Sequence, residues 1–93
     1  MPSRHALFLA CVQHRIKAVR EAKGLTQAEV ANRVDMRPED FQRFESLRGK
    51  KRFNPTLATL LLITEALEIE LAELLAPPTD AELKAARQQQ DVT

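Results

Sequence analysis

The 93 residues of this chain are enough for one domain with a modest hydrophobic core. The single cysteine, Cys11, excludes an intrachain disulfide and suits a reducing compartment, so we expect a cytoplasmic protein. No apolar stretch is long enough to cross a membrane, and residues 6–12 lead directly into polar and charged sequence without a signal-peptide cleavage site. The net charge of +1 neither favours nor excludes a nucleic-acid partner.

The charges are unevenly distributed along the chain. Residues 1–36 and residues 37–52 each carry six bases against three acids, whereas residues 53–93 carry two bases against seven acids. A domain polarised in this way can orient itself in the field of nucleic-acid phosphates although its net charge is nearly zero. For any one segment, an ordinary solvated charged face is the alternative.

A first helix is predicted from Ser3 or Arg4 to Ala22, because apolar residues recur there at intervals of three and four. This core-facing stripe consists of Leu9, Val12, Ile16 and Val19. Gly24 follows as a C-cap residue. Further apolar surface is supplied by Leu7, Phe8 and Cys11. These three residues either add to the core or form a dimer contact, and the sequence leaves both interpretations open.

Two short helices joined by a tight turn are predicted over residues 26–45. Thr26 and Glu29 form a capping box at the start of the first helix. Asp35 tolerates a left-handed backbone where the chain reverses, and Pro38 suits the first turn of the second helix. The apolar side of the second helix consists of Phe41 and Phe44. Helix, short turn and helix form the helix-turn-helix pattern, whose second helix can enter the major groove of DNA.

A further long helix follows, for which we expect Asn54 as the cap and Pro55 at the first position. Its inward stripe is expected to consist of Leu57, Leu60, Leu61, Thr64 and Leu67. Its apolar surface is widened by Leu62, Ile63 and Ala66. A short helix over residues 71–75 then closes the core, and this Leu-rich region is expected to dominate stability.

The prolines at residues 77–78 end that short helix. Thr79 and Glu82 repeat the capping-box signature and predict a short helix to about Arg87. Because Leu83 is its only large apolar residue, we expect this C-terminal helix to dock weakly.

Several linked segments resemble the lambda-repressor/Cro (XRE-like) family of helix-turn-helix domains. They are KGLTQAEVA at residues 23–31, Phe44-Glu45, Asn54-Pro55 and LEIELAELL at residues 67–75. The resemblance covers residues 14–76 and implies an all-α, five-helix domain that binds double-stranded operator DNA as a homodimer. Residues 1–13 would then be an N-terminal extension of the first helix, and residues 77–93 a C-terminal tail containing the short helix.

The resemblance also implies which residues touch DNA. Gln27 falls where the family places a polar group against phosphate, at a helix start that suits an anion. Arg37 and Glu39 fall at the start of the reading helix, and Gln42 and Arg43 lie one turn further along. Arg43 is the better base reader, because a guanidinium engages guanine O6 and N7 together, whereas Gln42 would read adenine.

The start of this reading helix departs from the family pattern. Pro38 has no side chain that can read a base, and Glu39 and Asp40 bring negative charge toward phosphate. The positive end of the helix dipole explains both acids structurally, and we favour this explanation. A hydrogen bond from cytosine N4 to a carboxylate is the functional alternative.

A basic run follows the reading helix, where it would lie against the DNA backbone. Its basic residues are Arg48, Lys50, Lys51 and Arg52. We expect them to contact phosphates, which would provide affinity and register rather than sequence choice. The alternative is a basic loop without a DNA contact.

The resemblance also implies that Arg20, late in the first helix, forms a structural ion pair with Glu45. If the pair is buried it fixes the angle between the two helices. Two exposed charges are the alternative.

The sequence offers few other candidates for metal binding or catalysis. Cys11 and His14 share a helix face, but two ligands do not make a structural zinc site. There is no nucleophile–base pair and no glycine-rich phosphate loop, so we expect no metal, no cofactor and no enzyme activity. The leading hypothesis is a transcription regulator, a repressor that binds a near-palindromic operator as a homodimer. The alternatives are an antitoxin whose C-terminal tail grips a protein partner, and a protein-interaction module with weakened DNA binding.

Overall fold

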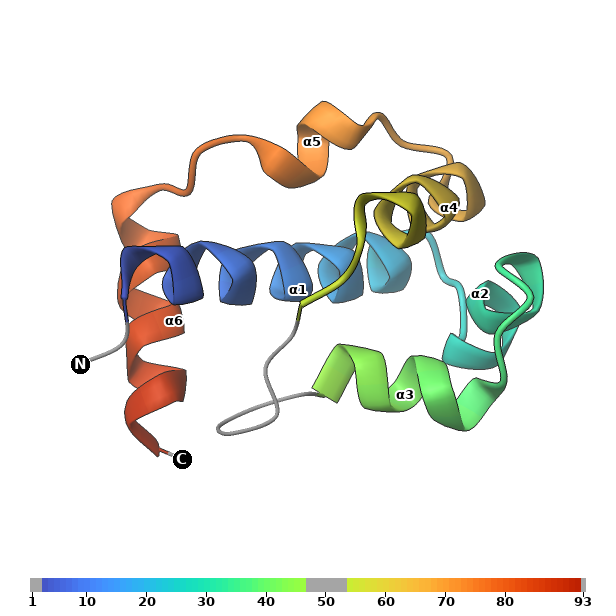
Figure 1. Cartoon of the computed structure of the whole chain (residues 1–93), viewed down its shortest axis with the longest axis horizontal. Helices are drawn as coiled ribbons and strands as arrows, with labels where there is room; N and C mark the ends of the chain where they lie inside the picture. The colour runs from blue at the N-terminus through green and yellow to red at the C-terminus, as the bar shows by residue number, and fades with distance from the viewer. Residues whose placement is uncertain (1–2, 47–53, 93) are drawn as a thin grey trace.

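The computed structural model describes residues 3–46 and 54–92, with side chains up to Gln88 (Figure 1). Every regular element in these two ranges is an α-helix, so the described fold is all-α, as expected from the sequence. The helices are α1 (Arg4–Ala22), α2 (Gln27–Arg33), α3 (Pro38–Ser46), α4 (Leu57–Leu67), α5 (Leu71–Leu75) and α6 (Asp80–Val92). Within the same ranges, no helix is long and apolar enough to cross a membrane.

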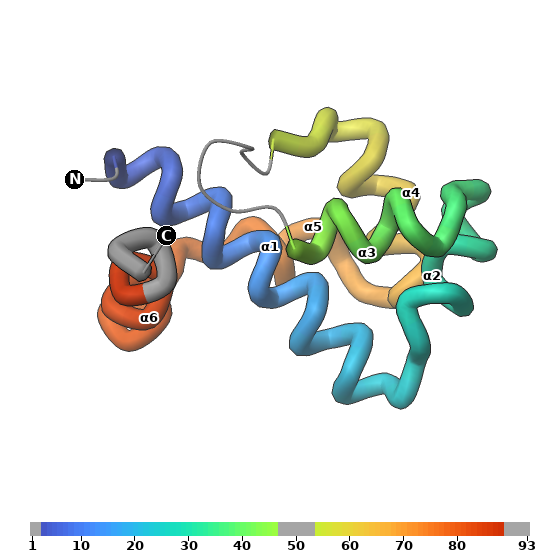
Figure 2. The backbone as a smooth tube through the Cα atoms, turned by 90° about the horizontal axis from the view of Figure 1, so that it is seen from below, coloured from blue at the N-terminus to red at the C-terminus, as the bar shows by residue number. Residues whose placement is uncertain are grey.

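Helix α2 packs mainly on α3 and α4, whereas α3, α5 and α6 pack directly against α1, the longest of the described helices (Figure 1). Helix α1 begins where the sequence predicts, because the Ser3 side chain accepts a hydrogen bond from the Ala6 amide at 3.0 Å. Helices α2 to α5 surround its C-terminal half. Helix α6 packs beside its N-terminal half, at the opposite end of the molecule from α2 (Figure 2). The helix runs without a break across residues 13 and 14, and the division of the chain at this point stays a prediction.

The main core joins α1 to α2, α3, α4 and α5. Its fully buried side chains come from all five helices: Val12, Ile16, Val30, Phe41, Ile63, Leu67 and Leu74. The predicted stripe of α1 is confirmed, because Val12 and Ile16 are buried and Leu9 and Val19 pack against them. Each fully buried large aliphatic side chain contributes about 1.5–3 kcal/mol to folding, so this cluster holds the five helices together.

The predicted start and inward face of α4 are wrong in part. Thr56, and not Asn54, is the N-cap, and its hydroxyl accepts a hydrogen bond from the Thr59 amide at 3.1 Å. Leu57 and Leu61 were expected inside but are 60% and 46% exposed. The buried residues of α4 are Leu60, Ile63, Thr64, Ala66 and Leu67. A helix that is apolar on every side has no hydrophobic stripe from which its inner face can be read, so packing alone chose this face.

Three helices end in the same turn, with a left-handed residue directly after the last helical turn. Gly24, Asp35 and Glu68 have φ angles of 70°, 55° and 57°. After α2, the Met36 amide donates back to the Ala31 carbonyl at 2.9 Å, which closes a Schellman-type turn. The predicted left-handed backbone at Asp35 is therefore confirmed. The left-handed Glu68 was not anticipated, because glutamate is rare in this conformation.

Helix α6 is longer and better docked than its sequence suggests. Its capping box is confirmed, with Thr79 and Glu82 exchanging hydrogen bonds of 3.0 and 3.1 Å. A second, smaller hydrophobic cluster joins it to α1 through Leu7, Cys11 and Ala86, all buried. Burial raises the pKa of the Cys11 thiol, which keeps it protonated at neutral pH. Leu7 and Cys11 therefore complete an intramolecular contact, which favours the core-packing interpretation of this surface over the dimer contact.

Arg15 provides the polar part of this docking. Its guanidinium pairs with the Glu82 carboxylate through two bonds of 2.8 Å. It also donates to the carbonyls of Leu74 and Ala76 at 2.9 and 2.6 Å, at the end of α5. One arginine of α1 thus holds the end of α5 and the start of α6 together. The weak docking expected from Leu83 alone is wrong, because that expectation counted only large apolar residues.

Candidate nucleic-acid interface

Helix α3 has an inner and an outer face of different chemistry. On the inner face Phe41 is fully buried, Glu45 is buried and Phe44 is half-buried, with the two rings stacked at a centroid distance of 5.9 Å. The exposed side chains of α3 include Glu39, Gln42 and Arg43. The spacing of these three residues places them together on the outer face. Three of the residues predicted to touch DNA are thus brought together on one exposed helix surface.

A buried polar network fixes the position of α3. Arg20 of α1 donates from Nε and Nη2 to the two carboxylate oxygens of Glu45, at 2.8 and 3.1 Å. The Arg20 and Glu45 side chains are only 10% and 2% exposed, so the expected ion pair is present and buried. Arg20 also donates to the Leu25 carbonyl at 2.8 Å, before α2 begins. The network therefore ties α3 to α1 and to the segment that leads into α2.

Gln27, at the start of α2, belongs to the same network. Its amide nitrogen donates to Glu45 Oε1 at 2.8 Å, and the side chain is half-buried. The sequence places this side chain against phosphate, whereas in the structure it also orients Glu45. An amide nitrogen carries two hydrogens, so one can still serve an outer acceptor, and the phosphate contact stays a prediction. The pairing with Glu45 was missed, because the two residues are 18 positions apart and no local signal links them.

A second ion-pair cluster lies at the start of α3. Arg37 donates from Nε and Nη2 to Asp40, at 2.9 and 3.4 Å. On the other side of this carboxylate, Arg43 Nη1 lies 4.0 Å from Asp40 Oδ1. The hydrogen bond that Arg37 donates to Asp40, and then the charge of Asp40, raise the pKa of the Arg37 guanidinium, so Arg37 stays charged. Sequence reasoning missed this cluster, although the i, i+3 spacing of the three residues could have revealed it.

The end of α3 is held by a residue that the sequence analysis did not single out. Gln13 of α1 donates from its amide nitrogen to the Phe44 carbonyl at 2.9 Å. Carbonyls in the last turn of a helix lack intrahelical partners, so this bond satisfies one of them. Helix α3 is thus anchored to α1 near its C-terminal end by Gln13 as well as by Arg20.

Four predicted phosphate contacts cannot be placed. Arg48, Lys50, Lys51 and Arg52 lie outside the described residues. Elsewhere on the surface, the large hydrophobic residues that are exposed in the described ranges are Leu57, Leu61, Leu62 and Leu75. All four belong to α4 and α5, so these two helices carry the exposed large hydrophobic side chains of the described residues.

In the part of the chain that is described, no three His, Cys, Asp or Glu side chains form a group that could hold a metal ion. We also compared the chain with protein-family models, with curated proteins and with solved structures, and none of these comparisons finds a match.

Proposed function

We propose that this protein is a transcription regulator of the repressor type, which binds double-stranded DNA in a sequence-specific manner through α2 and α3. One observation carries the proposal: α3 is fixed from inside by the Arg20–Glu45 network, while its outer face presents Glu39, Gln42 and Arg43 to solvent. A helix that reads bases must be held firmly and must expose polar side chains on its free face. The resemblance of residues 14–76 to lambda-repressor-like domains supports the same function.

The chemistry of the exposed residues suits the major groove, which is wide enough to admit an α-helix. The Arg43 side chain is 68% exposed, and its guanidinium can donate two hydrogen bonds to guanine. Gln42 can pair with adenine in a similar way. Such a protein would act in the cytoplasm, on the nucleoid.

A homodimer is part of the proposal, and the exposed face of α4 is the surface that supports it. This face carries Leu57, Leu61 and Leu62, with Glu65 as its charged residue. If two copies of α4 pack antiparallel around Leu61, the Glu65 of one copy lies near the N-terminal turn of the other. An acid is stabilised at this end of a helix dipole, so the pairing is electrostatically complementary. Two-fold symmetry then calls for a near-palindromic operator.

Selection of bound sites from random duplex DNA, followed by fluorescence anisotropy at several salt concentrations, tests this function. The parent should prefer one site, and log K should fall linearly with log salt as phosphate contacts release counterions. Arg43→Ala should cost about 1–3 kcal/mol on the best site and relax the preference at one base pair in each half-site. The selected site should contain two half-sites about 10 base pairs apart.

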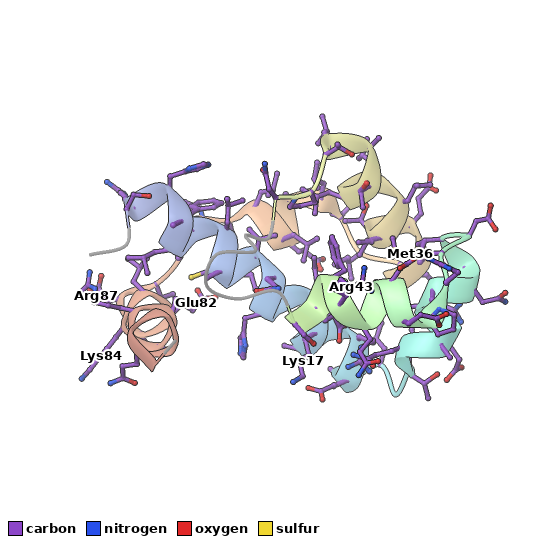
Figure 3. All side chains as sticks on the ribbon, turned by 60° about the horizontal axis from the view of Figure 1, so that its bottom comes forward. Lys17, Met36, Arg43, Glu82, Lys84 and Arg87 are labelled. Carbon is purple, nitrogen blue, oxygen red and sulfur yellow. The ribbon has the colours of Figure 1, made fainter. Side chains whose placement is uncertain are left out.

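Arg87→Ala is the matched control, because Arg87 is also exposed but lies on α6, away from α3 (Figure 3). It should leave base preference unchanged. If Arg43→Ala weakens the best site and a scrambled duplex equally, Arg43 is not a base reader. If the parent shows no salt-dependent binding to any duplex, the DNA-binding proposal fails and a protein-interaction module takes its place.

A further inference from the structure

We propose that Asp40 is a positioning residue for base recognition, which holds the guanidinium groups of Arg37 and Arg43 as a pair directed at guanine-containing base pairs. This inference rests on the proposed function. It assigns to Asp40 a part in specificity that the helix dipole alone does not provide.

The carboxylate of Asp40 lies between the two arginines. It accepts hydrogen bonds of 2.9 and 3.4 Å from Arg37 and stands 4.0 Å from Arg43 Nη1. The Arg37 and Arg43 side chains are 75% and 68% exposed, whereas Asp40 is 33% exposed. The acid is therefore the inner member of the cluster, and the two bases are the outer members that a ligand would meet first.

The arrangement differs from that of a simple N-terminal helix acid. An acid that only caps a helix accepts hydrogen bonds from backbone amides, as Glu29 does from the Thr26 amide at the start of α2. The side-chain hydrogen bonds of Asp40 come from Arg37 instead. Glu39, at the neighbouring position, already supplies an acid to the helix dipole.

The cluster also removes the apparent conflict between an acidic helix start and a DNA backbone. Asp40 by itself would repel phosphate, but together with Arg37 and Arg43 it forms a group of net positive charge. With Glu39 included, the start of α3 is neutral and not acidic, while the Asp40 carboxylate remains close to both guanidinium groups.

The hydrogen-bond geometry leaves donors for a base. Arg37 uses Nε and Nη2 on Asp40, and a guanidinium has five N–H donors in a planar fork. The hydrogens on Nη1, together with the second hydrogen on Nη2, can engage guanine O6 and N7. A guanidinium held by Asp40 also loses less rotamer freedom when it binds, so more of its interaction energy contributes to discrimination between base pairs.

Asp40→Asn tests this role, with Asp80→Asn as the matched control, since Asp80 is an exposed acid in the first turn of α6, away from α3. Binding is measured by anisotropy to the selected site, to duplexes that change one base pair of each half-site at a time, and to a scrambled duplex. Asp80→Asn should leave the base preference unchanged and should alter the affinity for all duplexes by a similar factor. Asp40→Asn should tighten binding to the scrambled duplex, because it removes an acid from the start of α3, but should lose roughly fivefold or more of the discrimination at guanine-containing positions.

A second comparison tests whether Asp40 affects base preference through Arg37 and Arg43. In an Arg37→Ala, Arg43→Ala background, Asp40→Asn should no longer change base preference, because the residues that it positions are absent. The inference is overturned if Asp40→Asn retains the full discrimination of the parent, as Asp80→Asn should; the DNA-binding function then still stands. If the parent binds no duplex at all, both the function and the inference are wrong.

Discussion

Two of the arginine–carboxylate ion pairs of helix α3 are alike in length and opposite in setting. The shortest contacts are 2.8 Å for Arg20–Glu45 and 2.9 Å for Arg37–Asp40. The first pair is 10% and 2% exposed and joins two helices, whereas the second is 75% and 33% exposed and spans a single turn. In the buried pair a lost partner leaves an uncompensated charge, while in the exposed pair water replaces the partner. The comparison shows that burial, and not distance, separates a pair that fixes the fold from one that can engage a ligand.

A third pair lies between these extremes. Arg15 and Glu82 are 15% and 30% exposed, and they join α1 to α6. The three pairs therefore form a series in which the cost of removing the acid should fall as exposure rises. Each variant below replaces one acid of the series by its amide.

Glu45→Gln should have the largest effect. It leaves the Arg20 guanidinium buried without a full counter-charge, and we expect a loss of about 3–5 kcal/mol in the free energy of unfolding. The bond from Gln27 to Glu45 would be disturbed as well. Urea denaturation measures the change, and Glu39→Gln on the exposed face is the control, expected within about 0.5 kcal/mol of the parent. Equal stability of Glu45→Gln and the parent would show that the pair does not stabilise this fold.

Glu82→Gln should have an intermediate effect, about 1–2 kcal/mol at neutral pH, because Arg15 keeps its bonds to the Leu74 and Ala76 carbonyls. The hydrogen bond from Arg15, assisted by the Thr79 amide, lowers the pKa of Glu82 from 4.5 to about 2. The folded state therefore binds this proton less readily than the unfolded state, and the stabilisation is present above about pH 4.5. It is lost as the pH falls toward about 2.

Urea denaturation of the parent and of Glu82→Gln between pH 7 and pH 3 checks this expectation. The difference in stability between the two proteins should shrink as the pH falls below about 4.5. A difference that stays constant over the whole range would mean that the charge of Glu82 does not contribute to the docking of α6.

Asp40→Asn should have the smallest effect on folding, within about 0.5 kcal/mol of the parent, because exposed i, i+3 pairs contribute little. Thermal unfolding checks this expectation. A loss comparable to that of Glu45→Gln would place Asp40 among the residues that hold the fold and would end the contrast between the two pairs of α3.

The sequence alone predicts the local structure of this protein well. The capping boxes at Thr26–Glu29 and Thr79–Glu82, the start of α1 and the left-handed Asp35 are all as expected. Each of these features depends on side chains and amides within three or four positions of one another, so the information lies in a short stretch of sequence. The Arg20–Glu45 pair was also anticipated, but only from the resemblance to a family.

Tertiary packing decided the features that involve distant residues. The inner face of α4 was misjudged at Leu57 and Leu61, because a helix with leucines on several sides has no clear apolar stripe, and its neighbours select the face that is buried. The docking of α6 depends on Arg15, which lies 67 positions before Glu82, and no local sequence pattern predicts that contact. The bond from Gln27 to Glu45 likewise forms only when α2 and α3 pack together. Most capping hydrogen bonds within one helical turn can be predicted from the local sequence, although the Thr56 cap of α4 was missed. The buried face of a helix and the partners of distant residues depend on the packing of helices that are far apart along the chain.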